Sequence, residues 1–193
     1  MSFDVLVQGG LVDMFGVSPE GIKQLQSDPD GVGPLLEHNH QYLKEALAQG
    51  GSLEVLTQKF IKYLDVELQT EVVDKINASP NECVEVPLQH WTRVILTVAS
   101  THAFLGDKFL KEEPDVIERL WEWEGDFQIL TLRLPEWMLK RAHKNRKLML
   151  QSFERHVFNE NSVPFIGHLE ELMRRRGMSD LDIGAGNFSF WSA

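Results

Sequence analysis

The sequence predicts an all-α fold, and three observations carry this prediction. Apolar residues recur at intervals of three and four along most of the chain, which is the period of one helical face. Serine or proline precedes these stretches and glycine follows them, as is typical of helix starts and ends. Strand-like alternation is nearly absent, since only the short segments 83–88 and 128–132 resemble strands.

Three helices are expected in the N-terminal half. Ser18, followed by proline, is typical of a helix start. A second helix is expected from about Leu35 until the glycine pair that begins at Gly50. Ser52 is expected to cap the longest helix, over 52–77. The apolar stripe of this helix consists of Leu53, Leu56, Phe60, Leu64, Leu68, Val72 and Ile76.

Five more helices are expected in the C-terminal half. Each has a start or stop signal: Gly106 ends the first, prolines open the second and third, and Gly177 ends the fourth. Ser179, with Asp182 three residues later, predicts a capping-box start for the last. The expected ranges are 88–105, 115–132, 136–158, 163–176 and one from Ser179 onward. The stripe of the first consists of Leu88, Trp91, Ile95, Val98, His102 and Leu105.

Composition places the chain among ordinary globular proteins. Its 193 residues are 42% hydrophobic and 25% charged, which suits a single domain over residues 1–193 or one part of a larger domain. The net charge of −10 argues against general binding to nucleic acid, whose phosphates need a basic surface. The single cysteine excludes an internal disulfide. The N-terminal segment is too short and too rich in glycine to span a membrane, so the chain is expected to be soluble or peripheral.

Individual residues offer little catalytic chemistry. Cys83 lies in a polar segment with nothing nearby to lower the pKa of a thiol, so we interpret it as inert. His38 and His40 are two positions apart, and on a helix they point to different faces, which makes a poor metal site. His102 lies on an apolar stripe and is interpreted as a hydrogen-bonded core histidine. No catalytic residue is assigned from these patterns.

Two charged runs have alternative interpretations. The run KRAHKNRK, residues 140–147, is interpreted as a solvated helix face, with a docking patch for an acidic partner as the alternative. In the run WEWEGDF, Glu122 and Asp126 are four residues apart and can pair as an acid–base dyad. Because no other polar group converges there, an exposed acidic face is favoured.

The order of the segments resembles the middle of a fungal-type cytochrome P-450. The resemblance rests on FGVSPEGIKQL, LKEALAQGGSLEVLTQKFIKYLDVEL, HWTRVILTVASTHAFLGDKFLKEEPDVIERLWEWEGDF, LPEWMLKRAHKNRKLMLQSF and GMSDLDIGAGNFSFWSA. It implies the helical central portion of that fold. It also implies a heme-thiolate monooxygenase, with heme as cofactor, a lipophilic small-molecule substrate and an electron-donating reductase. The implied location is the cytosol or the cytosolic face of the endoplasmic reticulum.

Some of the family's site residues have counterparts here. His40 and Lys44 match the spacing of the family's propionate-binding H-x-x-x-R, with lysine in place of arginine, and a pair of ordinary surface residues is the alternative. The resemblance also implies Phe190, Trp191 and Ala193 as a pocket wall. The sequence lacks the F-x-x-G-x-x-x-C-x-G thiolate motif. Matches to two other family motifs, by residues 171–174 and 185–189, are interpreted as coincidence.

The last residues, 182–193, resemble the first half of the family's central helix. We therefore interpret the chain as a truncated product or gene-model fragment that lacks the thiolate region and is inactive by itself. Phe188, Phe190 and Trp191 are then expected to lack their packing partners, to form an exposed apolar patch and to promote self-association. The alternatives are a non-catalytic helical interaction protein and a reductase-independent heme-thiolate isomerase.

Overall fold

The computed structural model confirms the all-α prediction. It describes residues 9–28, 31, 33–35, 37, 44, 48, 52–70, 85, 87–130, 132, 134–157 and 162–192, and the regular structure in these ranges is helical, without a strand. The helices are α2 (Pro19–Gln26), α4 (Ser52–Leu68), α6 (Leu88–Leu105), α7 (Asp107–Glu112), α8 (Val116–Leu130), α9 (Lys140–Arg155), α10 (Pro164–Arg175) and α11 (Asp180–Trp191). No helix within them is long and apolar enough to cross a bilayer.

The start and stop signals explain most helix boundaries. The Ser18 hydroxyl accepts a hydrogen bond from the Gly21 N–H at 2.9 Å and so caps α2. Ser179 caps α11 in the same way, accepting from the Asp182 N–H at 3.2 Å. Gly106 follows α6 with φ +78°, a backbone conformation that residues with a side chain rarely adopt. These signals were visible in the sequence, and the structure confirms them.

Pro135 marks a turn and not the start of a helix. The Met138 N–H donates to the Pro135 carbonyl at 2.9 Å, and α9 begins only at Lys140. The predicted range 136–158 is therefore wrong at its start: Pro135 is the first residue of a turn, and proline is common in turns as well as in the first turn of a helix. The segment 128–132, considered as a strand, belongs to α8 as far as Leu130. The end predicted for the longest helix lies outside the described residues.

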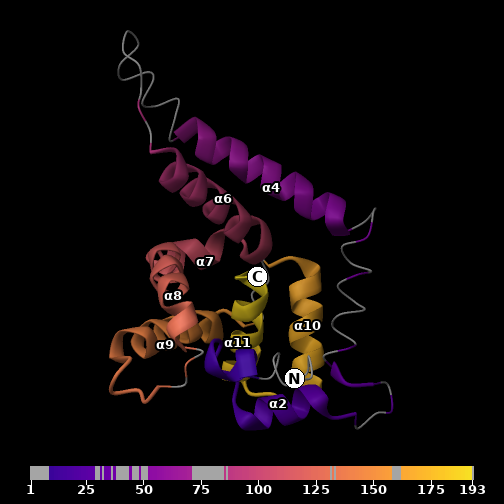
Figure 1. Ribbon diagram of the computed structural model, residues 1–193. Coiled ribbons are helices and arrows are strands. Elements are labelled where there is room, and N and C mark those ends of the chain that lie inside the picture. Colours follow the sequence, from indigo (N-terminus) through magenta and orange to yellow (C-terminus); the bar gives the residue numbers. More distant parts are fainter. Residues whose placement is uncertain are drawn as a thin grey trace.

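Helix α11 lies at the centre of the molecule. It packs against α9 and α10, and α8 also packs against α9 (Figure 1). Helices α4 and α6 form a pair that extends away from this centre, and α7 leads from α6 into α8 (Figure 1). Gly184 sets the distance between α11 and α9, since a Cβ there would lie 2.8 Å from the backbone nitrogen of Glu154.

The aromatic side chains of α11 are packed, which corrects the expectation of an exposed C-terminal patch. Phe188 is completely buried, and its ring centroid lies 4.7 Å from that of Trp123 and 5.3 Å from that of Phe153. Phe190 and Trp191 are half-buried, and the Trp191 indole N–H donates to the Thr101 hydroxyl at 3.1 Å. The expectation was wrong because the partners come from earlier segments of the chain. The basis for self-association through this segment is thereby removed.

One member of the predicted α6 stripe is exposed. Ile95 and Leu105 are buried, as the stripe predicts, but 68% of the surface of Leu88 is exposed. Leu88 is the first residue of α6, at the end of the helix distant from the centre of the molecule (Figure 1). Periodicity identifies which residues share a face, but the length of helix that another element covers depends on the tertiary fold.

Candidate functional site

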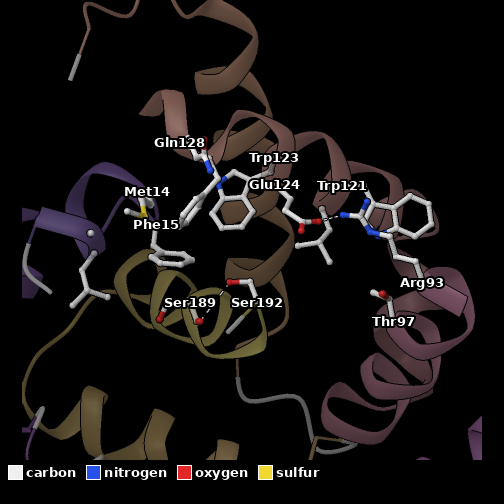
Figure 2. Close-up of a pocket in the computed structure, with 14 residues that line it drawn as sticks. Met14, Phe15, Arg93, Thr97, Trp121, Trp123, Glu124, Gln128, Ser189 and Ser192 are labelled. Atoms are coloured by element: carbon white, nitrogen blue, oxygen red, sulfur yellow. Dashed lines mark hydrogen bonds and ion pairs between the residues drawn. The ribbon is translucent and has the colours of Figure 1, made fainter. Parts of the chain in front are cut away.

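A cavity of about 880 Å³ opens between four segments of the chain. Residues 10–15 and the helices α6, α8 and α11 each contribute to its lining. Figure 2 shows the labelled side chains from these segments around one hollow. Its apolar lining residues are Leu11, Met14, Phe15, Leu120, Trp121, Trp123 and Phe127. Its polar lining residues are Arg93, Thr97, Glu124, Gln128, Ser189 and Ser192.

The apolar wall of the cavity is part of the aromatic core. The ring of Phe15 lies 5.4 Å from that of Trp123, and the ring of Phe127 lies 5.2 Å from Trp123 on the α8 side. Behind them, Phe188 meets Phe15 edge-on at 5.4 Å. Because interlocking aromatic rings of this kind are held by the buried core, the wall is rigid.

A charged pair stands at the α6–α8 side of the cavity. The Arg93 guanidinium forms an ion pair with the Glu124 carboxylate, and it lies 5.2 Å from the centre of the Trp121 ring. Both partners of the ion pair are substantially exposed, so it contributes at most about 1 kcal/mol to stability. It places one cation and one anion where the polar end of a bound molecule can contact them.

The other polar groups offer mostly acceptors. The Ser189 hydroxyl donates to the Gly186 carbonyl at 2.8 Å, and the Ser192 hydroxyl donates to the Phe188 carbonyl at 2.9 Å. Their protons are thereby used, and their oxygen lone pairs remain for a ligand. The indole N–H of Trp123 is buried and has no hydrogen-bond partner within the described part of the chain. Unpaired buried donors of this kind cost free energy, which a ligand acceptor or a water can recover.

A second polar cluster joins α4 to α6 and α7. His102 Nδ1 lies 3.0 Å from Asp107 Oδ1, and the imidazole stacks on the Tyr63 ring at 4.7 Å. A hydrogen bond from Tyr63 holds the pKa of Asp107 below its ordinary value, while burial and that same contact raise the pKa of Tyr63. His102 Nδ1 is therefore within ion-pair distance of Asp107, but it makes no hydrogen bond within the described part of the chain, so the hydrogen bond expected from the sequence is not shown. We interpret the cluster as a helix contact, because none of the three lines the cavity.

A third cluster surrounds the buried carboxylate of Glu113. It accepts hydrogen bonds from the Ser152 hydroxyl at 2.7 Å, from Arg155 Nε at 2.9 Å and from Arg119 at 3.2 Å. Burial opposes its ionisation, but these donors outweigh burial and hold the pKa of Glu113 below its ordinary value. Burial also lowers the pKa of His156, which lies beside it. Arg119 lies on α8 and Arg155 on α9, and both bind Glu113, the residue that follows α7. The cluster therefore ties α8 and α9 to the end of α7.

The charged run 140–147, at the start of α9, is divided between the core and the surface. Asp126 is buried and accepts from Arg141 at 2.6 Å and from the Asn145 amide at 3.4 Å. The interpretation of Glu122 and Asp126 as an exposed acidic face is therefore wrong for Asp126, because α9 covers it. Arg146 donates to the Asp13 carbonyl at 2.5 Å. These two arginines thus serve the fold, whereas the lysines of the run are exposed.

Of the two residues expected to contact heme, the structure describes Lys44 and not His40. Lys44 is exposed, and His40, Cys83 and Ala193 lie outside the described residues, as does His38. Phe190 and Trp191 point into the core and do not line the cavity, although their neighbours Ser189 and Ser192 do. The pocket wall implied by the resemblance stays a prediction.

The segments 171–174 and 185–189, whose matches to family motifs were interpreted as coincidence, have ordinary roles in the fold. Glu171 pairs with Arg175, and Arg174 pairs with Asp180, so neither contact joins Glu171 to Arg174. In the segment 185–189, Asn187 donates its amide hydrogen to the buried carboxylate of Glu170. In the described ranges, no three His, Cys, Asp or Glu side chains are grouped so that they could hold a metal ion.

Sequence reasoning missed most of the cavity residues. They come from four segments separated by up to about 180 positions, and only the tryptophan pair of α8 stood out as a motif. Comparison with known proteins adds no assignment, since no family model, curated protein or solved structure matches the chain.

Proposed function

We propose that the cavity binds a lipophilic small molecule. In this proposal the chain is the substrate-holding part of a heme-thiolate monooxygenase of the cytochrome P-450 type, which its sequence resembles. A reductase would be the electron donor. The location would be the cytosol or the cytosolic face of the endoplasmic reticulum. The observation that supports ligand binding is the lining of the cavity. Seven apolar or aromatic side chains and six polar ones line it, and apolar atoms form most of its surface. This is the usual composition of a small-molecule site.

The described residues do not themselves fit a heme site. They include no cysteine to serve as axial ligand, and the exposed Lys44 is described without its expected partner His40. We therefore derive no step through heme, and we assign the chain's own residues only the tasks of binding and orienting a substrate. The oxygen chemistry implied by the resemblance would be supplied by the heme group.

The cavity residues divide these tasks. Phe15, Trp123 and Phe127 provide the apolar contact and exclude water from the bound molecule. The hydroxyl oxygens of Ser189 and Ser192 accept hydrogen bonds, so they favour a ligand that carries a hydroxyl group. A binding free energy that comes mainly from apolar area should grow with the length of the ligand's alkyl chain.

Fluorescence of the cavity tryptophans provides the test. Titration with octanol, decanol and dodecanol should change the emission saturably, and the affinity should rise by roughly fourfold for each added CH₂ until the cavity is full. Thr97→Phe places a ring in the cavity and should weaken dodecanol binding at least tenfold by filling part of the space of about 880 Å³. Thr57→Phe makes the same change at an exposed position of α4 and should leave binding unchanged.

Two results would contradict this proposal. One is emission that changes linearly with alcohol concentration, without saturation and without dependence on chain length. The other is equal binding by the Thr97→Phe and Thr57→Phe variants. Circular dichroism would establish that both variants retain the helical content of the unmodified chain.

A further inference from the structure

Arg93 and Glu124 are the two charged side chains among the described residues that line the cavity. They belong to different helices, α6 and α8, and they form an ion pair with each other. The Arg93 side chain is 41% exposed and the Glu124 side chain is 59% exposed, so the pair lies where the cavity meets the solvent. Figure 2 shows the pair on the side of the hollow opposite Phe15. The cavity therefore has one charged end, and this end carries no net charge.

The ion pair uses only part of the binding capacity of each partner. It joins Nη2 of Arg93 to Oε2 of Glu124. Neither side chain makes another hydrogen bond or ion pair within the described part of the chain, so Nε, Nη1 and Oε1 have no polar partner there. A guanidinium and a carboxylate can each form several hydrogen bonds at once. The two partners can therefore keep their mutual contact while a bound molecule adds a contact to each of them.

Two contacts hold the Arg93 guanidinium in place before any ligand binds. The guanidinium carbon lies 5.2 Å from the centre of the Trp121 ring, within the range of a cation–π contact. Trp121 precedes Glu124 by three residues on α8, so the ring and the carboxylate lie on one face of that helix. The imidazole of His90 packs edge-on against the same ring at 5.5 Å and limits its movement. A charged group held in this way loses little freedom when a ligand arrives.

The balance of charge disfavours ligands that carry a single charge. Glu124 would repel a lone carboxylate bound to Arg93, at nearly the distance over which Arg93 attracts it. A lone ammonium bound to Glu124 would be repelled by Arg93 in the same way. A zwitterion gains an attraction at both of its charges, because its anion faces the arginine and its cation faces the glutamate. The pair therefore suits a head group that carries both charges.

We propose that the Arg93–Glu124 pair binds a zwitterionic head group, an ammonium and a carboxylate joined by a short spacer. The proposal rests on the function proposed for the cavity, and it names the class of lipophilic molecule that the cavity takes. The ammonium contacts Oε1 of Glu124, and the carboxylate contacts Nη1 or Nε of Arg93, so the four charges alternate in sign. The alkyl chain of the ligand then lies along the apolar wall that Phe15, Trp123 and Phe127 form.

Four amphiphiles with the same dodecyl chain test the head group. The zwitterion is N-dodecyl-N,N-dimethylglycine, and the others are dodecanol, the dodecanoate anion and dodecyltrimethylammonium. Each is titrated below the concentration at which it forms micelles, while the tryptophan emission of the chain is followed. The zwitterion should bind at least about tenfold more tightly than each of the others, because it adds two charge-assisted contacts without a repulsion.

Substitutions of the pair should change the order of the four affinities. Arg93→Gln leaves the charge of Glu124 and should make dodecyltrimethylammonium the tightest ligand. Glu124→Gln leaves the charge of Arg93 and should make the dodecanoate anion the tightest. Arg93→Glu with Glu124→Arg exchanges the two charges and should restore the preference for the zwitterion. A role in folding alone would not produce this reciprocal pattern.

A second ion pair provides the matched control. Glu171 and Arg175 pair on α10, where both side chains are exposed and neither lines the cavity. Glu171→Gln with Arg175→Gln should leave all four affinities unchanged. Exposed ion pairs contribute little to stability, so circular dichroism should show the same helical content and unfolding midpoint for every variant.

Failure of this proposal is distinguishable from failure of the function proposed for the cavity. If dodecanol binds saturably and Thr97→Phe weakens its binding, but the zwitterion binds no more tightly than the singly charged amphiphiles, the cavity binds lipophilic molecules and the head-group site is refuted. The head-group site is also refuted if the zwitterion binds most tightly but the substitutions of Arg93 and Glu124 leave the order of affinities unchanged. If none of the four amphiphiles binds saturably, both proposals are refuted.

Discussion

Ser18 and Asp182, 164 positions apart in the sequence, are joined by two hydrogen bonds. The Ser18 backbone N–H donates to Oδ1 of the Asp182 carboxylate at 2.7 Å, and the Ser18 hydroxyl donates to Oδ2 at 2.9 Å. The hydroxyl of Ser179, the cap of α11, donates to the same Oδ2 at 2.7 Å. One buried carboxylate therefore holds together the N-terminal ends of α2 and α11, where the helix dipoles favour a negative charge.

Replacement of Asp182 should destabilise the fold strongly. Asp182→Ala leaves the three donors from Ser18 and Ser179 without an acceptor, and we expect the free energy of unfolding to fall by about 3 kcal/mol. Urea unfolding followed by circular dichroism measures this change as a lower midpoint. Asp180→Ala removes an exposed carboxylate from the same helical turn and should cost less than about 1 kcal/mol. Equal losses in the two variants would show that Asp182 acts only as a helix-terminal charge.

Two glycine-to-alanine substitutions should have opposite effects. At Gly184 the new Cβ would lie 2.8 Å from the Glu154 backbone nitrogen, and because backbone cannot move aside easily, α9 and α11 must separate. We expect a loss of about 2 kcal/mol in spite of the higher helix propensity of alanine. At Gly125, in α8, the Cβ meets no atom within 4 Å, so alanine should stabilise by about 0.5–1 kcal/mol. Thermal unfolding of the Gly184→Ala and Gly125→Ala variants measures both changes: a lower midpoint for the first shows the packing cost, and a higher midpoint for the second shows the gain in helix propensity.

Truncation of Phe188 should show that α11 is part of the core. Phe188→Ala removes a completely buried ring, which typically costs about 3–5 kcal/mol. Leu181→Ala, on the exposed side of the same helix, should cost less than about 1 kcal/mol. If the Phe188 variant unfolded at the same urea concentration as the unmodified chain, the aromatic cluster around Trp123 would not be formed in solution.

The stability of the fold should depend on pH through Glu113. Because folding lowers the pKa of Glu113 from its ordinary value of 4.5, the carboxylate stabilises the fold fully above that value. This contribution is lost as the pH falls through the folded-state pKa. Glu113→Gln should therefore cost about 2 kcal/mol at pH 7, and the difference should shrink as the pH is lowered below 4.5. Glu118→Gln, an exposed change in α8, should follow the unmodified chain; a pH-independent cost at Glu113 would contradict the argument.

The local features of the fold could be predicted from the sequence because their causes are local. The caps at Ser18 and Ser179 and the stop at Gly106 depend on a few neighbouring atoms, and each was identified correctly. Pro135 was assigned wrongly because the same residue type suits a turn and a helix start. The all-α class followed from periodicity, which is also set by the helix itself.

The candidate site and the burial of single residues depended on the tertiary fold. The pattern around Asp126 was that of an exposed face, and only the position of α9 shows that Arg141 and Asn145 cover it. Phe188 was expected to lack partners, since partners were sought after it in the sequence, whereas they precede it. The cavity could not be predicted because no local pattern links residues 10–15 to Ser189 and Ser192.

The central position of α11 has a consequence for the order in which the protein is made. Synthesis proceeds from the N-terminus, so Phe15, Trp123 and Phe153 leave the ribosome before Phe188, the ring on which they converge. At about 5–20 residues per second, some seconds separate the emergence of the first ring from that of the last. During that interval the nascent chain exposes the apolar surfaces that Phe188 covers in the folded protein, and this part of the core closes only after Phe188 has emerged.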